Sequence, residues 1–228
     1  MVNDYQPQNL DKLIDMVRVA YENNNVKYLE VLVEQEVKNW KEKGVYFNKL
    51  NAIMIKAVVK DLDNNYKIDI DDITYLAEYL FKVEEWGLYE ITLFGNSMSV
   101  FNLNTIISFS KELINKTSIY KGVNSTIKAA TQVLINSVIL CLQYDRINEV
   151  AKLIKYLDEI IMNQDFYYER IKTLYLKGIY YIKKENIEEG KRLAYMAIEI
   201  MDRLDEKKLA INHREHLNEI LSKYEISR

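Results

Sequence analysis

The chain has 228 residues, and 49% of them are hydrophobic, which is enough apolar material for a sizeable core. Its 31 basic and 34 acidic side chains give a formal net charge of −3, without the clustered basic face that holds DNA. With one Pro and six Gly, the chain has few of the residues that hairpins and linkers require, so its composition predicts an all-α fold.

Cysteine content and hydropathy indicate the compartment. Cys141 is the only cysteine and lies in the apolar run VLINSVILCLQ, so a disulfide within the chain is impossible. No window approaches the roughly 18 uninterrupted apolar residues of a membrane span, and the first residues, MVNDYQPQNL, lack the apolar segment of a signal peptide. We expect a cytoplasmic protein with no membrane partner.

Apolar residues recur with helical spacing along most of the chain. The predicted helices span residues 8–24, 26–43, 46–61, 70–84, 87–95, 102–117, 124–143, 146–162, 166–184, 187–204 and 207–224. Two segments with a polar elbow followed by an apolar helix begin 40 residues apart, at Tyr144 and Lys184. Gly178, Gly190 and Ala197 occupy the small-residue positions of a tetratricopeptide repeat, where two helices approach closely. This pattern predicts a right-handed superhelix of tetratricopeptide-like helical hairpins, treated as one domain over 1–228.

The segment DLDNNYKIDIDD, residues 61–72, places acidic or amide oxygens at five ligand positions of a calcium loop. However, Tyr66 stands where that loop needs glycine, and Asp72 is shorter than the usual bidentate glutamate. The alternative is a solvated turn in which Asp69 caps the next helix. We favour the turn and predict no metal site.

The stretch LFKVEEWGLYEITLFGN, residues 80–96, interrupts an amphipathic pattern with a tryptophan and two glycines. We expect Gly87 to turn the chain out of one helix while Trp86 fills the space at the elbow. Gly95 is expected to end the short helix with positive φ. Asn96 then either belongs to the elbow or faces a ligand groove.

The segment ITYLAEYLFKVEEWGLYEITLFGNSMSVFNLNTIISFSKELI, residues 73–114, resembles the signature of the Rgg/GadR/MutR family of Gram-positive transcription regulators. The resemblance extends more loosely over most of the chain. It implies a tetratricopeptide-like sensor domain that binds a short imported peptide and forms a homodimer. Family members carry an N-terminal helix-turn-helix DNA-binding domain, which is absent here, so this chain corresponds to the sensor domain alone. A naturally truncated paralogue is the alternative.

The predicted helix 124–143 is apolar almost all round, except for one polar stripe. Lys128, Gln132 and Asn136 follow at intervals of four residues, and Gln143 comes seven residues later. Amides on such a stripe can pair with the backbone of a bound peptide, or they can be satisfied by a neighbouring helix. Because the family clamps peptides with helix-borne asparagines, the resemblance implies that role for Asn136.

On the predicted helix 166–184, Arg170, Thr173, Lys177 and Tyr181 follow one another along one side. A guanidinium or ammonium group there suits a peptide carboxylate, with Arg170 preferred because it can bind a carboxylate with two hydrogen bonds. The alternative is a solvated helix face. The candidate peptide-binding residues are therefore Asn96, Lys128, Gln132, Asn136, Arg170 and Lys177.

Signs of catalysis or cofactor binding are weak. His213, His216 and Glu219 share part of one helix face, which suits weak zinc binding but more often is an ordinary exposed surface. The chain has no Gly-rich phosphate loop and no nucleophile elbow, so we predict neither an enzyme nor a cofactor.

These observations predict the sensor domain of a quorum-sensing transcription regulator. A short signalling peptide would bind in its concave groove and change the dimer arrangement, which alters DNA binding by the missing N-terminal domain. The alternative is a constitutive helical-repeat scaffold for protein partners, which an exposed apolar patch would favour.

Overall fold

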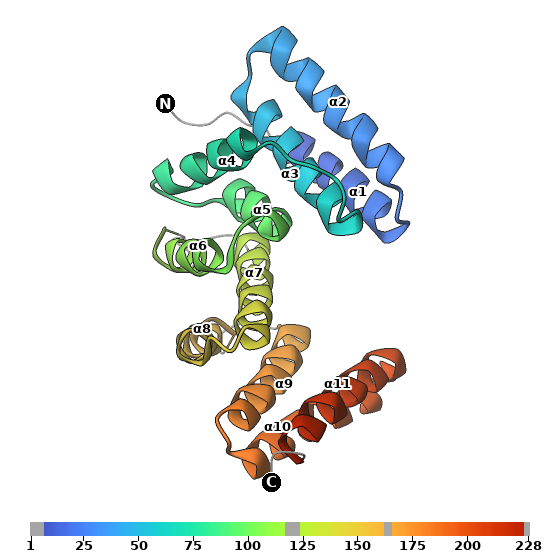
Figure 1. Ribbon diagram of the computed structural model, residues 1–228, viewed down its shortest axis with the longest axis vertical. Coiled ribbons are helices and arrows are strands. Elements are labelled where there is room, and N and C mark those ends of the chain that lie inside the picture. Colours follow the sequence, from blue (N-terminus) through green and yellow to red (C-terminus); the bar gives the residue numbers. More distant parts are fainter. Residues whose placement is uncertain (1–6, 117–123, 162–165, 226–228) are drawn as a thin grey trace. The chain divides into compact units, whose positions relative to one another are not determined.

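The computed structural model describes residues 7–116, 124–161 and 166–225. In these ranges it contains α-helices and one 3-10 helix but no strand, which confirms the all-α prediction (Figure 1). The chain divides into two compact units, Met1–Gly122 and Val123–Arg228, here called unit 1 and unit 2. The predicted helix ends agree with the observed ones to within about two residues, as expected for strongly periodic segments.

Unit 1 consists of six α-helices and the 3-10 helix in the described residues. They are α1 (Pro7–Glu22), α2 (Val26–Lys43), α3 (Tyr46–Leu62), α4 (Ile70–Lys82), α5 (Leu88–Asn96), η1 (Met98–Val100) and α6 (Leu103–Lys116). The central helix is α3, which packs against α2, α4, α5 and η1. Its buried Asn51 donates to Glu36 and accepts a hydrogen bond from the Tyr89 hydroxyl, so this polar side chain is satisfied inside the unit.

The tryptophan–glycine elbow of unit 1 is packed by aromatic rings. Trp86 is 2% exposed, as predicted, and its Nε1 donates to the Leu80 carbonyl at 3.2 Å. Gly87 precedes α5 in an extended conformation, and its N–H donates to Glu90 Oε2 at 3.0 Å. The expectation for Gly95 is wrong, because Gly95 lies inside α5 without a positive φ; the helix ends at Asn96, and the following Ser97 has a φ of −112°. The left-handed glycine of the described residues is Gly44, after α2.

The acidic segment between α3 and α4 is a capped turn, as favoured from the sequence. Asp69 accepts from the N–H of Asp71 at 3.0 Å and caps α4. Asp72 forms an ion pair with Lys56 at 2.6 Å, and Asp61 accepts from the Tyr21 hydroxyl at 2.7 Å. These carboxylates are therefore held by protein partners.

Within 124–161 and 166–225, unit 2 contains five helices. They are α7 (Asn124–Gln143), α8 (Ile147–Ile161), α9 (Tyr167–Lys183), α10 (Ile187–Arg203) and α11 (Lys207–Glu225). Helices α9 and α10 touch at Gly178 and Gly190, where a Cβ on either glycine would lie 2.7–2.8 Å from backbone atoms of the other helix. The predicted role of small residues in this helix crossing is thus confirmed, and Ala197 is fully buried.

The elbows of unit 2 repeat one backbone geometry. Asp145, Glu185 and Asp205 all have φ between 54° and 63°, in the left-handed region. In each case the next residue donates its N–H to a carbonyl five residues earlier, as from Asn186 to Tyr181 at 3.0 Å. The elbows at 145 and 185 are the two whose sequences align, so the predicted repeat corresponds to a repeated turn.

Helix α7 is long and apolar enough to cross a membrane by length and composition. However, 56% of its apolar window is buried inside the protein, and α7 packs on α8 and α9. Its apolar character therefore fits a core helix of unit 2.

Candidate functional site

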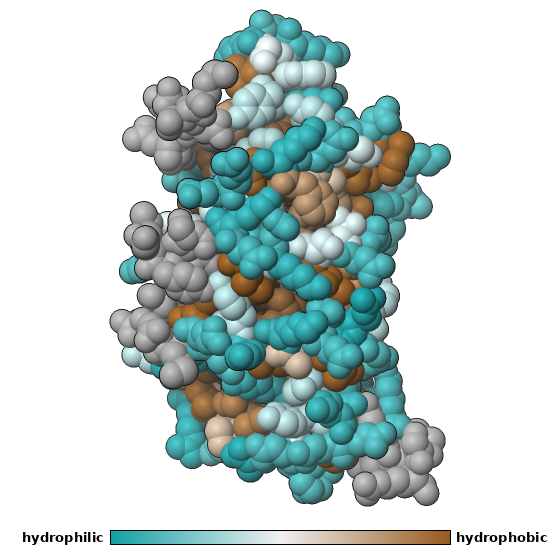
Figure 2. Space-filling model, turned by 90° about the vertical axis from the view of Figure 1, so that its left-hand side faces the viewer, coloured by the Kyte–Doolittle hydropathy of each residue, from teal (hydrophilic) through white to brown (hydrophobic). Residues whose placement is uncertain are grey.

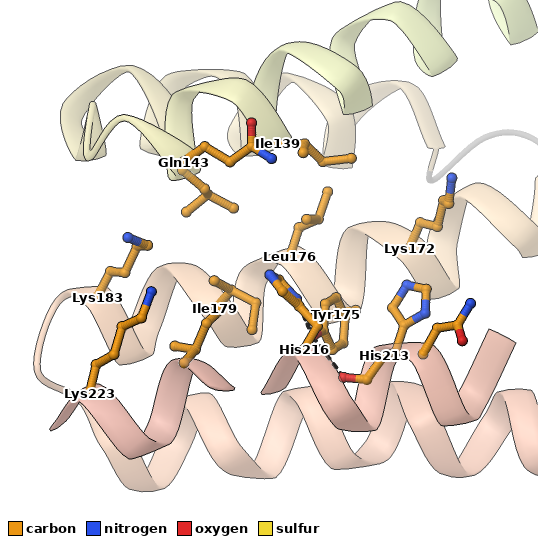
Figure 3. A pocket seen from close by; sticks show the side chains of 13 residues that line it. Ile139, Gln143, Lys172, Tyr175, Leu176, Ile179, Lys183, His213, His216 and Lys223 are labelled. Atoms are coloured by element: carbon orange, nitrogen blue, oxygen red, sulfur yellow. Dashed lines mark hydrogen bonds between the residues drawn. The ribbon is translucent and has the colours of Figure 1, made fainter. Parts of the chain in front are cut away.

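A cavity of about 380 Å³ lies within unit 2, between α7, α9 and α11 (Figure 3). Its apolar lining comes from all three helices, and polar groups are interspersed with it. The lining residues are Ile139, Leu142, Gln143, Lys172, Tyr175, Leu176, Ile179, Lys183, Asn212, His213, His216, Ile220 and Lys223. This combination of apolar walls and a few polar groups is typical of ligand-binding cavities.

The charged groups among the lining residues are lysines, with no Asp or Glu. Lys183 of α9 and Lys223 of α11 lie at one end of the cavity, and Lys172 lies at the other (Figure 3). Lys183 also contacts Asp145, at the elbow after α7, with 2.5 Å between Nζ and the carboxylate. The lining therefore favours an anionic group over a cationic one.

Two histidines and a tyrosine form a hydrogen-bonded group at the cavity. The Tyr175 hydroxyl donates to the His213 carbonyl at 2.9 Å and lies 2.8 Å from His216 Nδ1. Since the hydroxyl has a single proton, neutral His216 must donate from Nδ1 to Tyr175, which leaves Nε2 as an acceptor. His213 Nδ1 lies 2.8 Å from the Leu209 carbonyl and must donate to it. Both neutral imidazoles are therefore in the same tautomer.

The environment of the cavity keeps these histidines neutral. Burial lowers the pKa of His216; Glu219 opposes this effect, and Lys223 and Lys183 add to it. Burial also lowers the pKa of His213, with Lys172 contributing in the same direction. At neutral pH the positive charge at the cavity therefore comes from the lysines.

The polar stripe predicted on α7 leads to the cavity. Lys128 is exposed, while Gln132 and Asn136 are half-buried, with Gln132 Nε2 donating to Asn136 Oδ1 at 3.1 Å. Further along the same face, Ile139 and Gln143 line the cavity, as their labelled side chains show in Figure 3. Of the stripe, Gln143 lines the cavity, whereas Lys128, Gln132 and Asn136 are not among its lining residues.

The other predicted residues lie elsewhere. Arg170 donates through Nε and Nη2 to the Ile161 carbonyl at the end of α8, and Lys177 pairs with Asp158 of α8 at 2.6 Å. This side of α9 therefore faces α8. In unit 1, Asn96 donates to the Thr92 carbonyl at 2.9 Å within α5.

The sequence did not indicate which residues of α9 line the cavity. On α11 it singled out the two histidines but not the other lining residues. Lys172, Tyr175, Ile179 and Lys183 follow at intervals of three or four residues, but which side of α9 meets the cavity depends on its neighbours. The histidine pair was the available signal. The described residues hold no group of three His, Cys, Asp or Glu side chains arranged for a metal ion.

The hairpins, the repeated elbows and the close glycine contact define a tetratricopeptide-like helical-repeat domain. Residues 12–215 match the family described as HTH-type transcriptional regulator Rgg, C-terminal domain. The chain therefore belongs to the Rgg family, a family of transcription regulators and not of enzymes, which confirms the resemblance found in residues 73–114.

Solved structures agree with this assignment. The chain is similar to the SHP pheromone receptor Rgg2 of Streptococcus dysgalactiae, with 27% identity, a TM-score of 0.77, and coverage of 92% of this chain and 77% of Rgg2. It shares its fold with a transcriptional regulator of Listeria monocytogenes EGD-e, at 18% identity and a TM-score of 0.79, over 93% of this chain and 74% of that one. It also shares its fold with RopB, at 18% identity and a TM-score of 0.70, over 97% and 99% of the two chains.

Proposed function

We propose that this chain is the sensor domain of a peptide-responsive transcription regulator, and that it binds a short signalling peptide along α7, α9 and α11. The similarity to Rgg2, a pheromone receptor, over 92% of this chain carries the proposal. The cavity in unit 2 supports it, because it combines a ligand-sized volume with apolar walls and polar groups. The protein acts in the cytoplasm and needs no catalysis or cofactor for this role.

The α7 surface suits a peptide backbone. Gln132 and Asn136 carry amides, each with a donor and an acceptor, and can pair with peptide N–H and C=O groups whatever the peptide's sequence. Toward the end of α7, Ile139 and Gln143 lead into the cavity, which can take one end of the peptide. A peptide lying there contacts polar groups along its backbone and apolar walls at its end.

The output of binding is a shift between arrangements of a homodimer. The shift reaches DNA through an N-terminal helix-turn-helix domain of the full regulator. To move an equilibrium from 1:99 to 99:1, the peptide must bind one arrangement more tightly by about 5.5 kcal/mol. The receptor is favoured over a constitutive scaffold by the similarity to the pheromone receptor Rgg2. On the face shown in Figure 2, hydrophilic side chains interrupt the apolar areas.

Thermal unfolding tests the proposal. We would measure the melting temperature of the chain with synthetic short hydrophobic peptides encoded beside its gene, with a scrambled version of each as the control. A concentration-dependent rise with the authentic peptide alone is expected, because a ligand that binds the native state stabilises it by mass action. If no authentic peptide raises the melting temperature, the scaffold replaces the receptor.

The variant Asn136→Ala tests the α7 surface. We expect the peptide to bind about 1–3 kcal/mol more weakly, since a peptide group that paired with the amide is left without a partner. Lys155→Gln on the exposed side of α8 is the control. Unchanged affinity of the Asn136 variant in a calorimetric titration would remove this residue from the site.

A further inference from the structure

We propose that the cavity end between Lys183 and Lys223 binds the C-terminal carboxylate of the signalling peptide, with an apolar last side chain against Ile179 and Ile220. This inference deepens the proposed function and rests on it. It gives the peptide a direction on the domain, because its last residue is placed at the cavity while preceding residues extend along α7.

The charges at this end of the cavity support the binding of a carboxylate. Two ammonium groups from different helices, Lys183 of α9 and Lys223 of α11, lie at the same end of the cavity, and Gln143 of α7 lines it as well (Figure 3). Because no Asp or Glu is among the lining residues, an incoming carboxylate meets cations and an amide donor there.

The apolar walls indicate which carboxylate fits. A C-terminal residue carries its carboxylate and its side chain on one Cα, so an apolar side chain lies directly beside the charge. In an Asp or Glu side chain, by contrast, the carboxylate ends the side chain, and that residue offers the wall only the methylene groups that carry the charge. Ile179 and Ile220 stand one turn before Lys183 and Lys223 in α9 and α11, and a volume of about 380 Å³ holds one or two residues of a peptide.

Asp145 is a built-in competitor for this site. Its carboxylate lies 2.5 Å from Lys183 Nζ, and its side chain is 73% exposed while that of Lys183 is 18% exposed. Exposed ion pairs contribute little stability, so a ligand carboxylate can share or replace this contact at low cost. Removing the Asp145 charge should therefore strengthen carboxylate binding, whereas general damage to the fold would weaken it.

Two dipeptides test the site without knowledge of the natural peptide. We would titrate the full chain with N-acetyl-Leu-Leu as the free acid and as the C-terminal amide, and follow backbone amide resonances by NMR at millimolar probe concentration. The acid is expected to bind about tenfold more tightly than the amide, because charge-assisted hydrogen bonds form with the acid alone. Resonances of α9 and α11 near the cavity should shift.

Four variants locate the effect. Lys183→Gln and Lys223→Gln should each reduce the acid–amide difference to less than threefold, while Asp145→Asn should raise affinity for the acid about threefold and leave the amide unchanged. Lys177→Gln, on the α8-facing side of α9, is the matched control and should keep the tenfold difference. Circular dichroism and melting temperature would establish that each variant is folded.

The outcomes separate this inference from the proposed function. Equal affinity for acid and amide overturns the carboxylate site, and so does a loss of the difference in Lys177→Gln but not in the two cavity variants. If authentic peptides stabilise the chain equally as acids and as amides, the receptor stands and the inference fails. If no authentic peptide binds while the dipeptide acid still exceeds its amide, the proposed function fails and the cavity remains a carboxylate site.

Discussion

Units 1 and 2 are both helical, but they differ in what holds them together. In unit 1, Phe109 is surrounded by the rings of Phe81, Phe94, Phe101 and Trp86, at centroid distances of 4.4–6.1 Å. In unit 2, two glycines bring α9 and α10 into backbone contact. In unit 1, large aromatic rings fill the space between helices. In unit 2, two glycines without side chains let the helix backbones touch, so little space is left to fill.

The units also treat buried polar groups differently. In unit 1, Glu90 accepts from the Tyr79 hydroxyl at 2.7 Å and from the Gly87 N–H, so its carboxylate is satisfied by its own unit. In unit 2, Tyr175 and His216 are hydrogen-bonded to each other at the wall of a cavity. The comparison teaches that a closed polar network stabilises a fold, whereas one beside a cavity is available to a ligand.

The largest effect is expected in the aromatic cluster. Phe109 is fully buried, so Phe109→Ala should lower the free energy of unfolding by about 3–5 kcal/mol through lost burial and the resulting void. The measurement is chemical denaturation followed by circular dichroism. Phe81→Ala is the matched control, because Phe81 is 47% exposed and its loss should cost much less. Similar losses in both variants would contradict the claim that Phe109 contributes most to the stability of the aromatic cluster.

The second largest loss of stability is expected at the glycine contact of unit 2. In Gly178→Ala the new Cβ would lie 2.7 Å from the Ala194 nitrogen and 2.8 Å from the Gly190 carbonyl oxygen, so α9 and α10 must separate. We expect a loss of about 1–3 kcal/mol in the free energy of unfolding. The control, Gly87→Ala in unit 1, meets its nearest atom at an ordinary 3.5 Å. If Gly178→Ala is as stable as the unchanged chain, the close contact of α9 and α10 does not hold unit 2 together.

The histidines should make unit 2 sensitive to acid. The pKa of His213 and that of His216 are below the ordinary value of 6.5 in the folded state, mainly through burial. As pH falls below 6.5, the unfolded chain binds these protons first, so the free energy of unfolding decreases toward the lower folded pKa and then levels off.

Denaturation at several values between pH 8 and pH 5 measures this decrease. A chain with both histidines replaced by Gln should lose less stability over the same interval, and the difference between the two curves excludes the carboxylates common to both. If the curves run parallel, the histidines are not protonated differently in the folded and unfolded states.

The smallest expected effect is a gain at an elbow. Glu185 has φ 63°, so Glu185→Gly removes left-handed strain, offset in part by the greater freedom of glycine in the unfolded chain. We expect up to about 0.5 kcal/mol of added stability in denaturant titrations. Glu188→Gly, three residues later in the first turn of α10, should instead lower the stability, because glycine is a poor helix former. If both changes lower the stability, the Glu185 side chain stabilises the fold by more than the left-handed strain costs.

Much of the fold could be predicted because its signals are local. Helix positions follow from apolar spacing, the cap at Asp69 from the chemistry of its side chain, and the α9–α10 contact from the small residues Gly178 and Gly190. The site could be predicted in part. The α7 stripe runs toward the cavity through Gln143, but the chosen side of α9, with Arg170 and Lys177, meets α8.

The amino-acid sequence by itself determined the helices, their repeated elbows and the family, because each depends on residues close together along the chain. Only the tertiary structure decided that α5 continues past Gly95, and that Lys183 and Lys223 share one end of a cavity. The physical reason is that a helix presents several polar sides to its surroundings, and which of them meets a neighbour or a cavity depends on packing between segments distant in sequence.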